Sequence, residues 1–248
     1  MAGGGAPSGP FPVPHGLRAR AVDAVEEMDR PDCDPRRLER TYAQFRVVNA
    51  VVAGWRRLYA TRLRPLLAGT ANPTLLDVGC GGGDVARALA RWAARDRLRL
   101  DITAVDPDGR ALAFAARQPP LPGLVFRRAG TAELVAEGAR FDVVVSNHVL
   151  HHLDEAALRQ LLVDSEELCR GAAFHSDISR SPAAYALFSA GTLPFFPGSY
   201  IRRDGLTSIR RSYTAAELRA AVPPDWTVER DGPFRNLLVF RAESGPDA

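Results

Sequence analysis

The pattern of apolar positions along the chain changes character near residue 70. Between about residues 34 and 69 apolar residues recur every three or four positions, which is the spacing of amphipathic helices. From residue 74 onward short apolar runs alternate with helical patterns, which indicates a doubly wound, mostly parallel sheet with helices on both faces. Seven strands are expected, at about 74–79, 100–106, 124–128, 141–146, 172–178, 225–230 and 235–242.

Four helices and an insertion are expected between these strands. The helices cover 84–94, 109–117 and 154–170, and a capping box of Thr214 with Glu217 begins a further one. The segment 180–212 is apolar yet rich in Pro and Gly, and it follows the fifth strand, at the sheet edge where α/β proteins bind ligands. We expect four regions and a substrate-side insertion: a disordered tail (1–16), a helical cap (17–70), the α/β domain (71–243, with the insertion at 180–212) and a short tail (244–248).

Composition and charge narrow the class of protein. The chain of 248 residues is 46% hydrophobic and 25% charged, as in a soluble globular protein. Every one of its 32 basic residues is Arg, so Schiff-base lysine chemistry and a P-loop lysine are excluded. The net charge of +3 is spread along the chain, which argues against nucleic acid as a partner. Three widely spaced cysteines predict neither disulfides nor zinc, and no signal peptide or membrane span is seen, so a cytoplasmic location is expected.

The stretch TLLDVGCGGGDVARAL, residues 74–89, combines an apolar strand, a glycine turn and a helix. Gly79, Gly81 and Gly83 allow a sharp turn and a close approach of the backbone to a ligand. A dinucleotide fingerprint would need its third glycine at position 84, where Asp84 would repel a pyrophosphate instead. With Asp77 two residues before the first glycine, the loop suits a ligand that carries a carboxylate and an ammonium group.

An acidic residue follows at the end of the next strand. In the run ITAVDPD, Asp106 lies 23 residues after Gly83, about where an acid contacts ribose hydroxyls in this architecture. Strand, glycine turn, helix, strand and acid thus occur in the order that a nucleoside-binding α/β domain requires.

These motifs resemble the class I S-adenosylmethionine-dependent methyltransferases over residues 74 to about 242. The first motif reads LLDVGCGGG, the second AVDPD and the fourth-strand motif FDVVVSNHVLHHLDE. The resemblance implies a Rossmann-like fold, S-adenosylmethionine as cofactor and S-adenosylhomocysteine as product. Thr131 stands where the family usually has an aspartate for the adenine amino group. The cofactor-binding residues it implies are Asp77, Gly79, Cys80, Gly81, Gly83, Asp106, Pro107, Thr131, Ala132, Asn147 and His148.

Three histidines follow the fourth strand in the run NHVLHHLD. His151 or His152 would be a suitable base near neutral pH if the acceptor must lose a proton, and Asp177 at the end of the fifth strand could orient the imidazole. This arrangement resembles that of some natural-product O-methyltransferases. The alternative is that the imidazoles only pack or cap the following helix. No metal is expected, because the histidines lack the spacing of two ligands on one helix face and no Glu or Cys cluster accompanies them.

The helical run at 42–59 is similar to the corresponding helix of the ubiquinone and menaquinone C-methyltransferases. With the aromatic residues of the insertion it would roof an apolar pocket, so we expect a small lipophilic aromatic acceptor: a phenol, a quinone precursor or a polyketide, methylated on oxygen or on a ring carbon. The alternative is that these side chains belong to the core. The candidate substrate-binding residues are Tyr42, Phe45, Arg46, Trp55, Phe195, Phe196 and Tyr200.

Other classes of protein remain open at this stage. An RNA or other nucleic-acid methyltransferase would fit the pI near 9.0, although SNHV stands where base methylases often carry an NPPY or DPPY tetrapeptide. A non-catalytic S-adenosylmethionine-binding protein and an NAD enzyme are the further alternatives. A small-molecule acceptor is the expected partner, and the sequence leaves the oligomeric state open.

Overall fold

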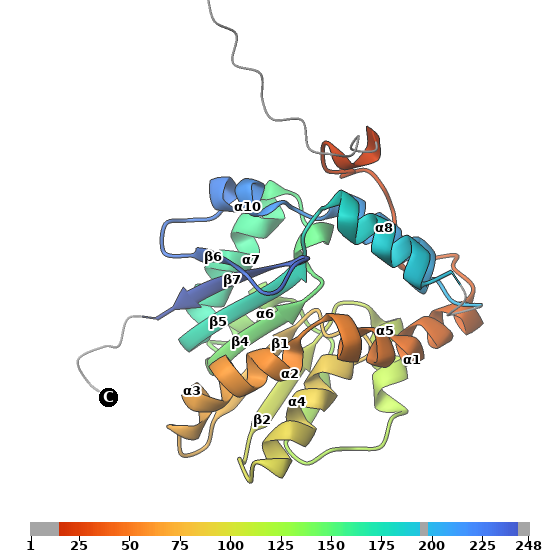
Figure 1. Cartoon of the computed structure of the whole chain (residues 1–248). Helices are drawn as coiled ribbons and strands as arrows, with labels where there is room; N and C mark the ends of the chain where they lie inside the picture. Colours follow the sequence, from red (N-terminus) through yellow and green to blue (C-terminus); the bar gives the residue numbers. More distant parts are fainter. Residues whose placement is uncertain (1–14, 194–197, 243–248) are drawn as a thin grey trace, which may run out of the picture.

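A mixed, seven-stranded sheet forms the centre of the molecule (Figure 1). The computed structural model describes residues 15–193 and 198–242. Within this part the strand order is β3-β2-β1-β4-β5-β7-β6, and only β7 runs antiparallel to its neighbours. The strands are β1 (Thr74–Val78), β2 (Asp101–Val105), β3 (Leu124–Arg127), β4 (Phe141–Asn147), β5 (Cys169–Ile178), β6 (Thr227–Arg230) and β7 (Arg235–Arg241). The predicted fold class is confirmed, and every predicted strand is present within a few residues of its expected bounds.

Helices cover both faces of the sheet because the central strands are apolar on both sides. In β1, Leu75 packs into one layer of the core and Leu76 into the other, as the alternation of side chains along a strand requires. The first layer is closed by α2 (Trp55–Leu58), the π-helical turn Tyr59–Leu63, α3 (Arg64–Ala68) and α4 (Asp84–Arg95). The second is closed by α6 (Thr131–Ala136), α7 (Glu155–Leu168) and α10 (Ala215–Ala221).

The N-terminal helices begin where the sequence predicted. The carboxylate of Asp34 accepts hydrogen bonds from the backbone N–H groups of Arg36 and Arg37, and Pro35 is the first helical residue of α1 (Pro35–Val52). Before α1 lie two short 3₁₀ turns, η1 (His15–Leu17) and η2 (Glu27–Asp29). We call residues 18–33, which include η2, the N-terminal strap.

The described part of the segment 180–212, which was expected to form an insertion after the fifth strand, contains two helices. They are α8 (Pro182–Gly191) and α9 (Ile201–Arg211), which pack against each other. Ser181 caps α8 and Pro182 begins it, so this proline starts a helix rather than breaking one. The capping box of Thr214 and Glu217 is confirmed at the start of α10. Helix α5 (Gly109–Ala116) packs beside β3 and against α1.

The buried ring of Phe174 in the middle of β5 provides a test of this core. Phe174 is fully buried among side chains of the first layer. We expect Phe174→Ala to lower the free energy of unfolding by about 3–5 kcal/mol, because it removes a large apolar side chain and leaves a cavity. Urea unfolding measures the change. Val125→Ala, at an exposed position of β3, is the control and should alter stability by less than about 0.5 kcal/mol.

Candidate functional site

The glycine loop after β1 adopts a backbone that glycine alone accommodates easily. Gly79, Gly81 and Gly83 all have positive φ angles, of 66°, 52° and 79°. A Cβ at Gly79 would lie 2.6 Å from Cγ2 of Val149, so the loop packs tightly against the segment that follows β4. A Cβ at Gly81 would meet nothing within 4 Å, so the loop leaves open space on that side.

Asp77 carries an oxygen that the protein leaves without a partner. The side chain is buried, and its Oδ2 has no hydrogen-bond partner among the described residues. Burial, together with the nearby carboxylates of Asp84 and Asp106, raises the pKa of Asp77 well above its usual value. An unpaired buried carboxyl group is costly, and a cationic ligand group beside it would remove that cost. The unpaired acceptor oxygen of Asp77 therefore fits the ammonium end of a ligand such as S-adenosylmethionine.

Asp106 faces the same loop from the end of β2. Its Oδ2 accepts a hydrogen bond of 2.8 Å from the backbone N–H of Gly81, and its Oδ1 accepts one of 2.8 Å from Asp108. Burial raises the pKa of this carboxyl group above its usual value. Pro107 is exposed beside it. The structure thus brings together the glycine loop and the acid that the motif spacing predicted.

The other predicted cofactor residues differ in how free they are to bind a ligand. The Thr131 hydroxyl donates a 2.5 Å hydrogen bond to Asp164, so it must turn away from α7 before it can reach an adenine. The side chain of Asn147 accepts from Nε1 of Trp55 at 2.9 Å. Cys80 is buried, whereas Ala132 is exposed. The cofactor role of these residues stays a prediction.

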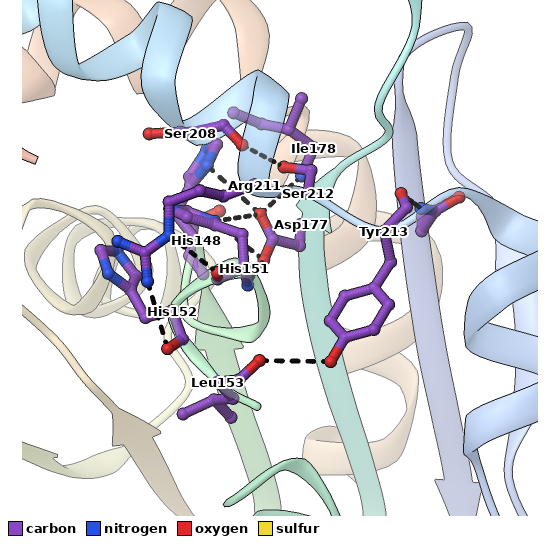
Figure 2. A network of polar contacts seen from close by, with 12 residues as sticks. His148, His151, His152, Leu153, Asp177, Ile178, Ser208, Arg211, Ser212 and Tyr213 are labelled. Carbon is purple, nitrogen blue, oxygen red and sulfur yellow. Dashed lines mark hydrogen bonds and ion pairs between the residues drawn. The ribbon is translucent and has the colours of Figure 1, made fainter. Parts of the chain in front are cut away.

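The histidines lie where β4 and β5 end side by side (Figure 2). In the 3₁₀ turn η4 (Leu150–His152), Nδ1 of His151 lies 2.9 and 3.0 Å from the two carboxylate oxygens of Asp177, and the backbone N–H of His151 donates to Asp177 at 2.7 Å. His148, with a φ of 59°, places its Nδ1 3.8 Å from the same carboxylate. The structure therefore brings His151 and Asp177 into the contact that was expected between a base and its orienting carboxylate.

A further acidic residue, which sequence reasoning missed, lies on the other side of His151. Oε1 of Glu26, in the N-terminal strap, is 3.2 Å from Nε2 of His151, and the two side chains are 4% and 2% exposed. Burial alone would lower the pKa of His151, but the carboxylates of Asp177 and Glu26 together raise it to about 10. His151 is therefore an imidazolium at neutral pH, held between two carboxylates.

These groups also bear on metal binding. Possible ligand atoms of Glu26, His151 and His152 lie within 4.8 Å of one another, as do those of His148, His151 and Asp177. Folding also places one glutamate, Glu26, beside these histidines, which the sequence spacing did not indicate. Ion pairs around His151 account for both groups, and the absence of a metal stays a prediction.

The predicted acceptor residues lie in different environments, and three of them are buried. Tyr42 and Tyr200 are buried in one cluster with Leu38 and Ala111, and Trp55 belongs to the first core layer. This packing favours the core interpretation of these three side chains. Phe45 is half-buried at the edge of the cluster and Arg46 is exposed, while Phe195 and Phe196 lie outside the described residues.

The ion pairs of His151 predict a definite pH dependence of stability. Because the pKa of His151 is raised from 6.5 to about 10, its stabilising contribution is complete below pH 6.5 and is lost as the pH rises toward about 10. Burial alone would raise the pKa of Glu26 and of Asp177, but the positive charge of His151 and its hydrogen bonds lower the pKa of each to about 2. Their contribution is complete above about pH 4.5 and is lost as the pH falls toward about 2.

The melting temperature of the wild type measured between pH 5 and 10 checks the alkaline side of this dependence. His151→Gln serves as the comparison, since glutamine does not titrate. The difference in melting temperature between the two proteins should shrink from pH 6.5 to 10. A constant difference would contradict the ion-pair assignment.

Comparison with known proteins agrees with this geometry. Residues 76–166 match the family model described as "Methyltransferase domain". The plantazolicin methyltransferase BpumL in complex with S-adenosylhomocysteine superposes with a TM-score of 0.51 at 13% identity, over 83% of this chain and 95% of that one. Magnesium protoporphyrin IX methyltransferase from Synechocystis PCC 6803 gives 0.50 at 17% identity, over 82% and 86%. The chain thus has the fold of these methyltransferases and matches the methyltransferase-domain family over residues 76–166.

The curated relatives that the chain matches include ubiquinone biosynthesis O-methyltransferases. The ubiquinone biosynthesis O-methyltransferase of Azorhizobium caulinodans is 33% identical over 166 residues, 65% of this chain and 59% of that protein. The enzyme of the same name from Pseudomonas paraeruginosa is 36% identical over 123 residues, 48% and 50% of the two chains. The matches thus span less than two thirds of these relatives.

Among the described residues, no helix combines the length and the apolar character needed to cross a bilayer.

Proposed function

We propose that this protein transfers a methyl group from S-adenosylmethionine to an oxygen or ring carbon of a small lipophilic aromatic acceptor. The observation that carries the proposal is the cradle formed by the glycine loop, with the unpartnered Oδ2 of Asp77 below it and the Asp106 carboxylate beside it. A cofactor with an ammonium group and a ribose matches these donors and acceptors. The neighbouring His151–Asp177 pair lies at the same carboxyl edge of the sheet, where an acceptor would approach.

When bound, the cofactor would supply an electrophilic methyl group on a sulfonium. The protein's part is to bind and to align, because a sulfonium leaving group needs no proton. Asp77 would neutralise the ammonium end, Gly79 and Gly81 would let the backbone approach it, and Asp106 would exchange its bond to Gly81 for the ribose hydroxyls. The tight contact between Gly79 and Val149 couples this cradle to the histidine turn.

His151 is proposed to hold the acceptor's oxygen. A general base must be neutral before it takes a proton, and the two carboxylates around His151 keep its imidazole charged at neutral pH. An imidazolium can instead hold an ionised oxygen by a charge-assisted hydrogen bond. Asp177 would keep the ring in position through Nδ1. His152 is less enclosed than His151, because 32% of its side chain is exposed to solvent.

The nature of the acceptor is supported by two independent observations. Half-buried aromatic rings flank the glycine loop: a Cβ at Gly82 would lie 3.1 Å from Cδ1 of Phe114, and Phe45 lies at the edge of the same cluster. Moreover, the relatives in Azorhizobium and Pseudomonas are named for O-methylation in ubiquinone biosynthesis. A phenol, quinone precursor or polyketide fits both observations.

Calorimetry and a methylation assay test the proposal. S-adenosylhomocysteine should bind the full chain whereas NADH should not, and labelled S-adenosylmethionine should transfer its methyl group to members of a panel of phenols and quinols. Binding of NADH alone would overturn the proposal. Binding of S-adenosylhomocysteine without transfer to any member would favour a non-catalytic protein, and salt-dependent methylation of RNA would favour the nucleic-acid alternative.

A further inference from the structure

The carboxylate of Glu26 lies among three side chains that can donate hydrogen bonds: His151 and His152 in η4, and Ser208 on α9. Its Oε1 accepts a 2.7 Å hydrogen bond from Oγ of Ser208, lies 3.2 Å from Nε2 of His151 and lies 4.0 Å from Nε2 of His152. We propose that His151, Ser208 and His152 form a subsite for an ionised oxygen of the acceptor, and that Glu26 fills this subsite until the acceptor replaces it. The proposal rests on the methyltransferase function above.

The geometry of the ion pair shows that Glu26 is an imperfect occupant. Nε2 of His151 is buried, and its approach to Glu26 does not satisfy hydrogen-bond geometry despite the 3.2 Å separation. By contrast, Nδ1 of His151 is fully engaged with Asp177. The nitrogen that faces the strap is thus the one whose hydrogen-bonding capacity is left unused. A ligand oxygen aligned with that N–H would gain a bond that Glu26 does not make.

The strap that carries Glu26 is held by polar contacts. The carboxylate of Asp204 on α9 accepts hydrogen bonds from the backbone N–H groups of Glu27 and Met28, at 2.8 and 3.0 Å. Arg20 donates to the carbonyl of Arg211 at 2.7 Å. Two of the strap's apolar side chains, Val22 and Val25, are 55% and 61% exposed. Around Glu26 water can replace these hydrogen bonds, whereas Met28 and Cys33 further along the strap pack against the cluster around Tyr42 and anchor it there.

The charges around His151 favour an anionic oxygen on the acceptor. The positive charge of His151 is matched by Asp177 on one side and by Glu26 on the other. Replacing Glu26 by an ionised oxygen keeps the net charge of this buried site unchanged and gives the imidazolium N–H a charge-assisted hydrogen bond, which is stronger than the bond that a neutral oxygen would accept. The acceptor oxygen that fits is a carboxylate or an acidic phenolate, attached to the aromatic or apolar body that the cap would cover.

An ionised acceptor also makes the transfer step simple. A lone pair of the oxygen forms the new bond to the methyl carbon while the carbon–sulfur bond breaks, and its electron pair returns to sulfur, which becomes an uncharged thioether. No proton is released in this step, because the oxygen arrives without one. His151 keeps its proton throughout, so its hydrogen bond weakens as the oxygen loses its negative charge and the methylated product can leave.

Calorimetry with small probes in the presence of saturating S-adenosylhomocysteine tests the subsite. Glu26→Ala should bind benzoate, and 4-nitrophenolate at a pH where it is ionised, at least tenfold more tightly than the wild type does. The two anions separate a carboxylate acceptor from a phenolate acceptor. Benzamide, which is neutral and of the same shape as benzoate, should bind both proteins equally weakly. The double variant Glu26→Ala with Ser208→Ala should lose most of the gain.

Two further variants separate the subsite from a general loosening of the strap. Asp204→Asn leaves Glu26 in place but weakens the strap's attachment, so benzoate affinity should rise about threefold. Asp23→Ala, at an exposed strap position, should bind benzoate as the wild type does. Near-ultraviolet circular dichroism checks folding, and Asp204→Asn is decisive if Glu26→Ala does not fold. Glu26→Ala binding benzoate no more tightly than benzamide would overturn the subsite alone, whereas failure of S-adenosylhomocysteine to bind the wild type would overturn the proposed function itself.

Discussion

His151→Gln should lower the turnover number by roughly 100-fold or more, while the affinity for S-adenosylhomocysteine stays within about twofold of the wild type. The variant removes the positive charge that faces the acceptor but leaves the glycine loop, Asp77 and Asp106 untouched. Steady-state kinetics and calorimetry measure the two quantities. Unchanged turnover would remove His151 from the reaction.

His175→Gln is the matched control for this variant. His175 is also a buried histidine, and it lies on β5 like Asp177, but its ring is hydrogen-bonded to Ser146 and Ser165 and stacks on Trp226. Burial lowers the pKa of His175 to about 3, so its ring is neutral. We expect His175→Gln to lower the melting temperature and to leave the turnover of the folded protein near the wild-type value.

The pH dependence of turnover separates the two roles of His151. If His151 holds an ionised oxygen as an imidazolium, turnover rises through the pKa of the acceptor and falls as His151 loses its proton, at about pH 10 in the strapped protein. If it acts as a base, turnover rises through the pKa of His151 itself. An acceptor of lower pKa should therefore move the acidic limb of the profile only in the first case.

Asp106→Ala should weaken the binding of S-adenosylhomocysteine by about 100-fold or more. Two hydrogen bonds from ribose hydroxyls to a carboxylate contribute about 1.5–3 kcal/mol each, and each 1.4 kcal/mol corresponds to about tenfold in affinity. Calorimetry measures the change. Asp101→Ala is the control, since Asp101 is an exposed carboxylate at the start of the same strand, and it should bind the cofactor product normally.

Affinity of Asp106→Ala within about threefold of the wild type would show that the carboxylate serves only the loop. This outcome has to be tested because Asp106 also accepts a hydrogen bond from the backbone N–H of Gly81. Asp106→Asn distinguishes the cases further. Its amide can still accept one backbone bond, so it should retain the loop geometry while losing much of the attraction to the ribose.

The parts of this site that sequence could predict are those that depend on local geometry. The glycine loop needs positive φ angles at fixed positions, and the cap of α1 needs an acceptor at Asp34, so each leaves its mark within a few residues. Parallel strands bring their carboxyl ends to one edge, which is why Asp77, Asp106 and Asp177 could be placed near one another from strand order alone.

What sequence could not predict depends on contacts between distant segments. Glu26 lies in a stretch without helical or strand periodicity, and its partner Ser208 is 182 residues away. Nothing in the composition of the strap distinguishes this buried glutamate from the half-buried Glu27 beside it. Likewise, Thr131 has the residue type for an adenine contact, yet its hydroxyl bonds to Asp164 on a helix whose packing angle no local pattern encodes.

The strap's dependence on α9 has a consequence for how the protein is made. During synthesis residues 18–33 leave the ribosome long before Asp204 and Ser208 exist, so the carboxylate of Glu26 has no partner while β1 to β5 are already emerging. The cofactor cradle, built from contacts close in sequence, can form early, whereas the acceptor side closes last. A nascent chain that ends before α9 would therefore carry the cradle without the acceptor side, and it would reach competence only when α9, in the last fifth of the polypeptide, has been released.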